Sequence, residues 1–302
     1  MPYISTWRDE LTPEMLQIAE KELGETPEVR KTALKALRKL ISEEGDFCPQ
    51  TDEMFLLRFL RAKKYDVKKS FVTLRNYYIF KARYAGLLTD FRPTEMKSIM
   101  EMNNLLFLPS RHPCGATIGC LRMGYFDMEK VSAEQIFATC LIGLEYILQF
   151  EPTQVCGYIL IFDLSKFSLK ILRHFASPTF LFRCVRLVQD CIPCRVKGFH
   201  VINEPFYINI IFSIIKTLLS EKLTKRIHFH GNNIKNLHQH LPPDLLPTEF
   251  GGTIGSMASH CKELSNKIIG RESAYERLIK FGFQEKKIQH FKKQDSRSVF
   301  LK

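Results

Sequence analysis

Two groups of side chains in this sequence have the residue types and spacing of a metal or redox site. Cys191 and Cys194 form a CxxC pair, and His228 and His230 alternate in a short apolar run, so an extended backbone would place both imidazoles on one face. No second CxxC pair accompanies the first one. We therefore favour ordinary packing over a zinc or redox site, and we expect no metal and no cofactor.

Acid–base chemistry would fall to Asp163, His200 or Glu204. Asp163 ends an apolar run, and ligands of α/β proteins gather where such strands end. The sequence has no nucleophile elbow, no P-loop and no GxGxxG motif, and neither His200 nor Glu204 has a recognisable catalytic partner. The sequence therefore predicts a protein that is not an enzyme.

The charge balance points to an anionic partner. The chain has 302 residues, is 45% hydrophobic and carries a net charge of +12, which suits either nucleic acid or an anionic membrane. No aromatic–basic motif or recognition helix is recognisable, so we expect no nucleic acid. A nucleic-acid binder stays as the third hypothesis, ahead of an enzyme.

Several features indicate a cytoplasmic protein, which we expect to be a monomer. The opening residues lack the pattern of a signal peptide, and nine scattered cysteines are typical of reduced thiols. No apolar run reaches the ~18–20 residues of a membrane span, because Lys216 interrupts the best candidate.

The pattern of the chain divides it into three parts. Residues 1–90 have helical spacing and no strand pattern, with N-caps at Thr26 and Asp66. Residues 91–255 alternate short apolar runs with helical patterns, which is typical of a largely parallel α/β sheet. We expect a C-terminal helix and a basic tail in residues 256–302. The predicted strands are 116–123, 156–163, 195–203 and 226–230, and Ser132 and Gln135 form a capping box before a helix.

One helix-like segment, Phe206–Leu219, is too apolar for the surface of a globular protein. Ile211 and Ile215 share one face, while Phe206 and Ile210 lie nearly opposite. A surface helix needs one apolar stripe of roughly a hundred degrees. We therefore expect a second apolar partner: core, a bound lipid or a membrane.

Five motifs together resemble the CRAL-TRIO lipid-binding family, and within it the tocopherol transfer protein, clavesin and cellular retinaldehyde-binding branches. They cover about residues 25–255, and five in the expected order are far more specific than one. The motifs are LLRFLRAKKYDV (Leu56–Val67), IFDLSKFSLK (Ile161–Lys170), VKGFHVINEP (Val196–Pro205), RIHFHGNN (Arg226–Asn233) and LLPTEFGG (Leu245–Gly252).

The resemblance implies a helical N-terminal domain packed on an α/β domain, whose mixed sheet floors an apolar cavity closed by a gate helix at Glu204–Leu219. Apolar residues on such elements are ordinarily core, but the family places a hydrophobic ligand among them. Cys140 and Leu144 replace hydroxyl-bearing residues of the tocopherol protein, which weakens tocopherol as the ligand and leaves retinoids and other lipids open. The implied ligand-binding residues are Phe137, Cys140, Leu141, Leu144, Leu160, Phe162, Phe167, Ile192, Phe199, Val201, Ile208, Ile211 and Ile215.

The resemblance also implies a phosphoinositide site on a basic patch beside the gate helix. Lys222 and Arg226 lie one helical turn apart if the helix continues past Leu219, although such a pair is ordinarily a solvated surface. We expect a lipid carrier that docks on phosphoinositide-bearing endosomal or plasma membranes, or alternatively a trafficking adaptor of the clavesin type. The matching residues are Lys63, Arg195, Lys197, Lys216, Lys222 and Arg226.

Overall fold

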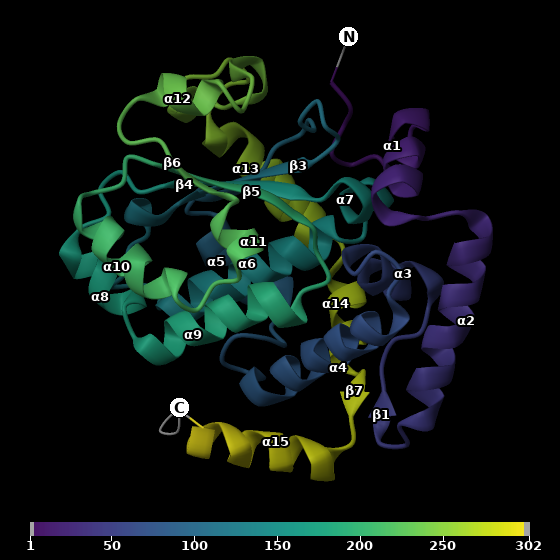
Figure 1. Ribbon diagram of the computed structural model, residues 1–302. Helices are drawn as coiled ribbons and strands as arrows, with labels where there is room; N and C mark the ends of the chain where they lie inside the picture. Colours follow the sequence, from purple (N-terminus) through teal and green to yellow (C-terminus); the bar gives the residue numbers. More distant parts are fainter. Residues whose placement is uncertain (1–2, 299–302) are drawn as a thin grey trace.

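A five-stranded sheet lies at the centre of the structure, a computed structural model that describes residues 3–298 and side chains as far as Lys292 (Figure 1). The strands follow the order β2-β3-β4-β5-β6; β2 is antiparallel to β3, and all other pairs are parallel. Their bounds are β2 Leu105–Phe107, β3 Thr117–Arg122, β4 Tyr158–Asp163, β5 Val196–Ile202 and β6 Ile227–Phe229. The mixed, largely parallel sheet confirms the predicted fold class.

Helices cover both faces of this sheet. In Figure 1, α6, α9 and α10 lie below the sheet and α12 lies above it. The capping box at Ser132 and Gln135 is present and starts α6. The helices of this unit are α5 Lys97–Met100, α6 Ala133–Ile147, α7 Glu151–Cys156, α8 Leu169–Phe175, α9 Pro178–Arg186 with a π-helical turn at Leu187–Cys191, α10 Tyr207–Lys216, α11 Glu221–Thr224 and α12 Ile234–His238.

The N-terminal helices begin at the residues that the sequence suggests. The hydroxyl of Thr26 accepts from the Val29 amide, and the carboxylate of Asp66 accepts from the Lys69 amide at 3.0 Å. Each such bond satisfies a donor that a helix start leaves free. The helices are α1 Pro13–Ile18 with a π-helical turn at Ala19–Leu23, α2 Pro27–Glu43, α3 Glu53–Ala62 and α4 Val67–Tyr84.

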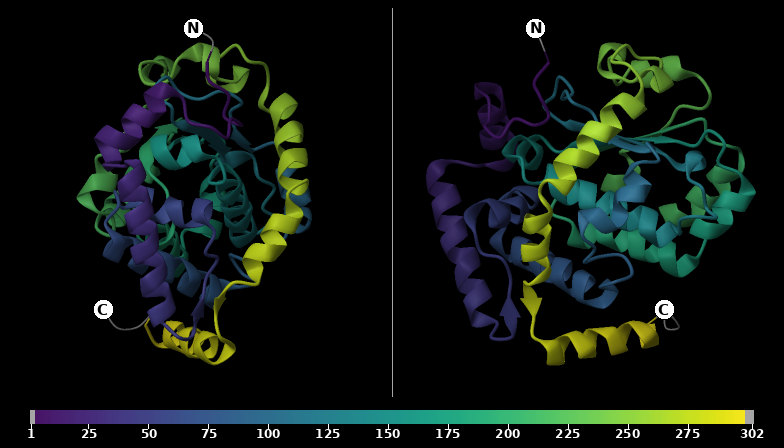
Figure 2. Two further views of the ribbon diagram at one scale, coloured as in Figure 1. Left: turned by 90° about the vertical axis from the view of Figure 1, so that its right-hand side faces the viewer. Right: turned by 180° about the vertical axis from the view of Figure 1, so that it is seen from behind.

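The C-terminal segment returns to the N-terminal helices and completes them. Helices α13 (Met257–Ile269) and α14 (Glu272–Ile279) run down the back of the molecule, and α15 (Glu285–Ser298) lies across its end (Figure 2). Strand β7 (Gly282–Phe283) pairs with β1 (Phe47–Cys48). Strand β1 lies within residues 1–90, where the expectation of no strand is wrong, because a two-residue strand depends on its distant partner and leaves no local pattern.

Buried charges join the helical unit to the α/β unit. Arg61 on α3 has no exposed surface; its guanidinium pairs with Glu25 at 2.6 Å and with Glu151 at 2.5 Å. It also donates to the side-chain oxygen of Gln154 at 2.9 Å. Because Glu151 and Gln154 belong to α7, Arg61 fixes the position of α3 against the α/β unit.

Candidate functional site

An apolar cavity of about 450 Å³ lies between the sheet and the helices below it. Strands β3, β4 and β5 form its floor, α6, α8 and α9 form its walls, and α10 covers it. The polar atoms among its lining side chains belong to Tyr158, Cys140 and Cys184. Such a space fits a molecule with few polar groups.

Every residue predicted to bind the ligand lines this one cavity. Their contact with a ligand stays a prediction. The thirteen side chains are those of Phe137, Cys140, Leu141, Leu144, Leu160, Phe162, Phe167, Ile192, Phe199, Val201, Ile208, Ile211 and Ile215.

Helix α9 supplies a wall of the cavity that is absent from the predicted set of ligand-binding residues. Phe180, Leu181 and Val185 face the cavity from this helix, and Val188 follows in the π-helical turn. The amphipathic spacing of α9 shows that one face is covered, but it does not distinguish a cavity from solid core.

The polar groups on the cavity wall are uncharged at neutral pH. Burial raises the pKa of the Cys140 thiol to about 12 and raises the pKa of the Tyr158 phenol well above its usual value. Burial also raises the pKa of Cys184. A thiol or phenol in this environment stays protonated, so the cavity offers no fixed charge to a ligand.

The gate helix α10 has two apolar faces. Ile208, Ile211 and Ile215 point into the cavity, whereas the side chains of Phe206 and Ile210 on the other face are 82% and 63% exposed. Ile214 and Leu218 continue the outer row. A continuous exposed apolar row of this kind marks an interaction surface.

Few hydrogen bonds hold the gate helix in place. The Tyr207 hydroxyl donates to the Phe167 carbonyl at one end. At the other end, the amide of the Gln189 side chain donates to the Leu218 carbonyl at 3.0 Å and accepts from the Ser220 amide at 2.6 Å. None of the residues of α10 is fully buried. Segments with so few buried contacts open at low free-energy cost.

The structure changes the geometry expected for the basic patch. The helix does not continue past Leu219: α10 ends at Lys216, and the Ser220 hydroxyl caps the separate helix α11 by accepting from the Leu223 amide. Arg226 follows α11 and donates to the Val196 carbonyl. The physical reason is the N-cap, because a serine that bonds the backbone starts a new helix rather than continuing one.

Five cations lie near one another at this end of the gate helix, and we call them the cationic cluster: Lys63, Lys64, Arg195, Lys222 and Arg226. Burial lowers the pKa of Lys222, and the other four charges lower it further. Among the described residues, Lys222, Lys63 and Lys64 form no ion pair. Repulsion among cations of which three lack an acidic partner indicates a site for an anion.

Two of the predicted basic residues already have an acidic partner, and one lies apart. Glu22 pairs with Arg195 at 2.5 Å and with Lys197 at 3.0 Å. Lys216 lies on the gate helix itself and is not among the charges that act most strongly on Lys222 or Arg226. Phosphoinositide binding by the six residues stays a prediction.

Two of the three candidate catalytic residues, Asp163 and Glu204, hold strand ends together. Buried Asp163 accepts from the Ser165 amide at 2.9 Å and from the side-chain amide of Asn203 at 2.9 Å, and Arg122 donates to it at 3.2 Å. The Glu204 carboxylate accepts from a backbone amide. These bonds join the ends of β3, β4 and β5.

The CxxC pair and the histidines lie in different surroundings. Cys191 is buried and lies near Lys63, whereas His228 and His230 pack with other imidazoles. Over the part of the chain that the structure describes, no three His, Cys, Asp or Glu side chains are placed to hold a metal ion.

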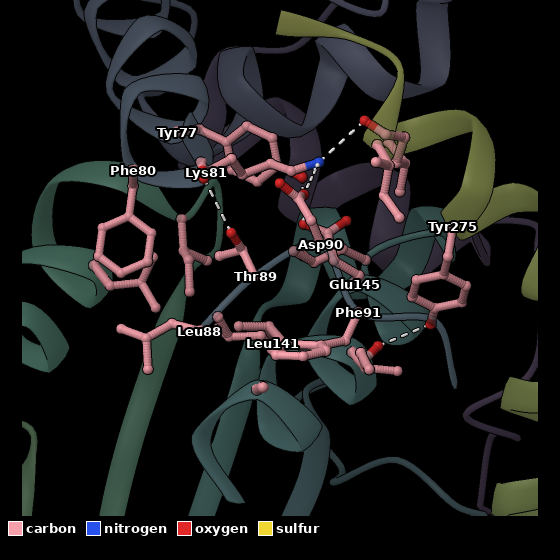
Figure 3. Close-up of a pocket in the computed structure, with 18 residues that line it drawn as sticks. Tyr77, Phe80, Lys81, Leu88, Thr89, Asp90, Phe91, Leu141, Glu145 and Tyr275 are labelled. Carbon is pink, nitrogen blue, oxygen red and sulfur yellow. Dashed lines mark hydrogen bonds and ion pairs between the residues drawn. The ribbon is translucent and has the colours of Figure 1, made fainter. Parts of the chain in front are cut away.

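A second pocket lies behind α6, and Figure 3 shows the residues around it. Its volume is about 70 Å³, enough for a few water molecules but not for a lipid. The ammonium group of Lys81, which lines this pocket, already has partners: it pairs with Asp90 at 3.2 Å and donates to the Leu278 carbonyl at 3.0 Å. We therefore assign the pocket to the seam between the two units.

The sheet, the covered cavity and the helical N-terminal unit define the CRAL-TRIO architecture. The CRAL/TRIO domain model matches residues 101–252, and the CRAL/TRIO N-terminal domain model matches residues 33–76. The chain belongs to this family.

Curated relatives agree with the family assignment. The chain is 33% identical to "Alpha-tocopherol transfer protein-like" of Mus musculus over 248 residues. This alignment covers 82% of this chain and 72% of the relative. Over 264 residues it is 32% identical to "Clavesin-1" of Rattus norvegicus, covering 83% and 74%. None of the helices in the described residues combines the length and apolarity that crossing a bilayer requires.

Proposed function

We propose that this protein is an intracellular lipid-binding and transfer protein. It carries a hydrophobic ligand, tocopherol-like, retinoid or another lipid, in the cavity of about 450 Å³. The observation that carries the proposal is the gate helix, which covers this cavity with one apolar face and exposes a second one beside uncompensated cations. The names of the relatives support a carrier rather than an enzyme.

The proposed cycle uses the two faces of the gate helix in turn. The cationic cluster docks on an anionic, phosphoinositide-bearing membrane, either endosomal or plasma membrane. The outer apolar row then contacts the lipid while the gate helix swings outward, and the ligand enters or leaves. In transit the protein is a cytoplasmic monomer with the gate helix closed.

The wall of the cavity supports a ligand with few polar groups. Cys140 and Leu144 both line it, and neither supplies a hydroxyl. Burial of apolar surface contributes roughly 25 cal/mol per Å², so a large apolar ligand is retained without strong polar contacts.

A phosphoinositide-binding trafficking adaptor is the second candidate, and the identity to clavesin-1 favours it. In that case docking on membranes and binding to vesicle coats are the main activities, and ligand carriage is secondary. A pull-down of coat proteins by the full chain and by a chain without residues 293–302, which keeps Phe291 in the core, separates the two. Loss of capture with the shortened chain supports the adaptor.

The deciding experiment is lipid extraction. The purified protein is incubated with liposomes made from a whole-cell lipid extract, re-isolated, and examined by native mass spectrometry. We expect one apolar lipid per chain, and transfer of that lipid between vesicles that is faster when the acceptor contains phosphoinositide. A protein that extracts no lipid, from vesicles with phosphoinositide or from vesicles without it, is not a carrier.

The outer row of the gate helix gives a second prediction. We expect the I210S/I214S variant to lose most of its transfer rate. The two isoleucines are exposed and would enter the membrane, whereas serines at these positions would not. Bound lipid, measured by mass spectrometry, is expected to stay at one per chain, since neither residue lines the cavity. The matched control is I279S, an exposed isoleucine on α14. Equal loss of bound lipid and transfer would contradict this division between the faces.

A further inference from the structure

Four histidines from separate parts of the chain gather on the outer face of the sheet. Along β5 and β6, Phe199, Val201, Ile227 and Phe229 face the cavity, so the side chains between them point to the opposite face. His200, His228 and His230 are those side chains, and His240 joins them after α12. The ring centroids of His200 lie 5.1 Å from each of the other three.

Hydrogen bonds join two of the imidazole rings directly and connect a fifth histidine to the cluster. Nδ1 of His200 lies 2.9 Å from Nε2 of His230, so one of the two donates and the other accepts. A fifth histidine, His112, bonds through Nε2 to the His240 carbonyl at 3.0 Å and through Nδ1 to the Cys114 thiol at 3.0 Å. If His200 and His230 were both protonated, two donors would face each other across this bond.

The groups that face His200 oppose its protonation. Burial lowers the pKa of His200 to about 3, and His230, His228, His240 and His112 lower it as well. Burial, followed by neighbouring imidazoles, also lowers the pKa of His228 and of His230.

The remaining titratable groups lie around His112. Burial opposes the charge of His112, but the bond to Cys114, the charge of Cys114 and the bond to the His240 carbonyl together outweigh burial and raise the pKa of His112. Burial also opposes thiolate formation at Cys114, and His112 and Lys197 outweigh that effect, so the pKa of Cys114 is lowered. The pair of His112 and Cys114 becomes more positive as the pH falls. It therefore adds to the repulsion within the cluster.

The segment Ile227–Gly231, which carries two of these histidines, also holds the gate helix. Phe229, between His228 and His230, packs its ring against Phe212 of α10, with centroids 4.9 Å apart. The amide of Gly231, the next residue after His230, donates to the Glu204 carboxylate at 3.0 and 3.1 Å at the start of the gate segment. Strand β6 is an edge strand with β5 as its single neighbour, so a shift of β6 moves both supports of the gate helix.

We propose that the histidine cluster of His200, His228, His230 and His240 is an acid-sensitive latch that releases the gate helix when His200 is protonated. The repulsion that protonation creates is relieved when β6 and the segment that carries His240 separate from β5. This separation withdraws Phe229 and Gly231 from the gate helix. The role in ligand release rests on the proposed function. A negative surface potential of about −30 mV lowers the local pH by about half a unit, so an anionic membrane would itself favour opening.

The sign and size of the effect follow from linkage. In an open cluster His200 recovers its ordinary pKa of 6.5, compared with about 3 when it is closed. The closed form therefore keeps its full stability above pH 6.5 and loses it as the pH falls from there toward 3. At pH 5.5 an open His200 is about tenfold more protonated than neutral, so opening becomes about tenfold more frequent for this residue alone.

The test is amide hydrogen exchange of the ligand-free protein, without membranes, at pH 7.4 and 5.5, corrected for intrinsic exchange. We expect protection of Tyr207–Leu219 and Ile227–Gly231 to fall at least tenfold, while α3 and α4 keep theirs. Equal loss in α3 and α4 would mean general acid unfolding and would overturn the proposal. Because no ligand is present, a failure here leaves the carrier function untouched, and a failed lipid extraction leaves this test valid.

Variants assign the effect to the cluster. H200Q keeps a hydrogen-bonding group beside His230 but removes the proton, so its gate segment is expected to exchange at nearly the same rate at both pH values. H228Q/H240Q, at the more exposed rim, is expected to show a smaller response than the unchanged protein. The control is H174Q, an exposed histidine on α8, which keeps the full response. A response in H200Q as large as that of the unchanged protein, or in H228Q/H240Q if H200Q does not fold, would refute the latch.

Discussion

Binding to phosphoinositide-containing vesicles is expected to weaken about thirtyfold when Lys222 and Arg226 are both replaced by alanine. Each cation near an anionic surface contributes on the order of 1 kcal/mol, and these two lie in a cluster where the charges repel one another until an anion arrives. Vesicle cosedimentation at physiological salt measures the change. The affinity for the bound lipid is expected to stay within about twofold, because neither residue lines the cavity.

The matched control is K31A/K35A, which removes two exposed lysines with the same i, i+4 spacing on α2. Docking is expected to be unchanged in this variant, since α2 carries no part of the cationic cluster. If both double variants lose docking equally, net charge alone attracts the protein to membranes. If K222A/R226A loses ligand and docking in parallel, the cluster does not act separately from the cavity.

Replacement of Arg61 by alanine is expected to destabilise the protein by about 3–5 kcal/mol, the range found when one partner of a buried pair is removed. Glu25 and Glu151 would be left with Arg30 alone as a cationic partner, at 3.9 and 3.2 Å, in a site where Arg61 has no exposed surface. Urea denaturation followed by circular dichroism measures the change. We also expect α3 to separate from α7, because the guanidinium is their main polar connection.

The control is K39A, whose partner Glu43 lies one turn away on the exposed face of α2. Exposed pairs of this kind have little effect on stability, so its denaturation midpoint is expected to match that of the unchanged protein. A similar, small change in both variants would show that Glu25 and Glu151 are hydrated or neutralised when Arg61 is absent.

The sequence predicts the α/β unit well where local pattern and tertiary environment agree. The capping box before α6 and the apolar runs of β3, β4 and β5 identify these elements, because parallel strands buried on both faces have continuous apolar sequence. The two apolar faces of Phe206–Leu219 also follow from spacing alone, since Ile208 and Ile210, at about 100° per residue, must point in nearly opposite directions on a helix.

The rest depends on contacts between distant residues. Nothing local to Phe47 indicates that it pairs with Phe283, and spacing does not show that Gln189 holds the end of the gate helix. The sequence suggests a shared strand face for His228 and His230 but does not place His240 against them. It also gives no sign that Ser220 starts a new helix and so changes the orientation of Arg226.

The pairing of β1 with β7 has a consequence for the order in which the protein is made. Leu278, Phe283 and Phe291 belong to the same hydrophobic core as Phe47 and the α2–α4 helices. A ribosome releases the N-terminal helices first, yet their core lacks three of its side chains until residues 278–291 have left the exit tunnel. The α/β unit, whose strands end at Phe229, is available earlier. We therefore expect the first helices synthesised to be the last to become protease-resistant.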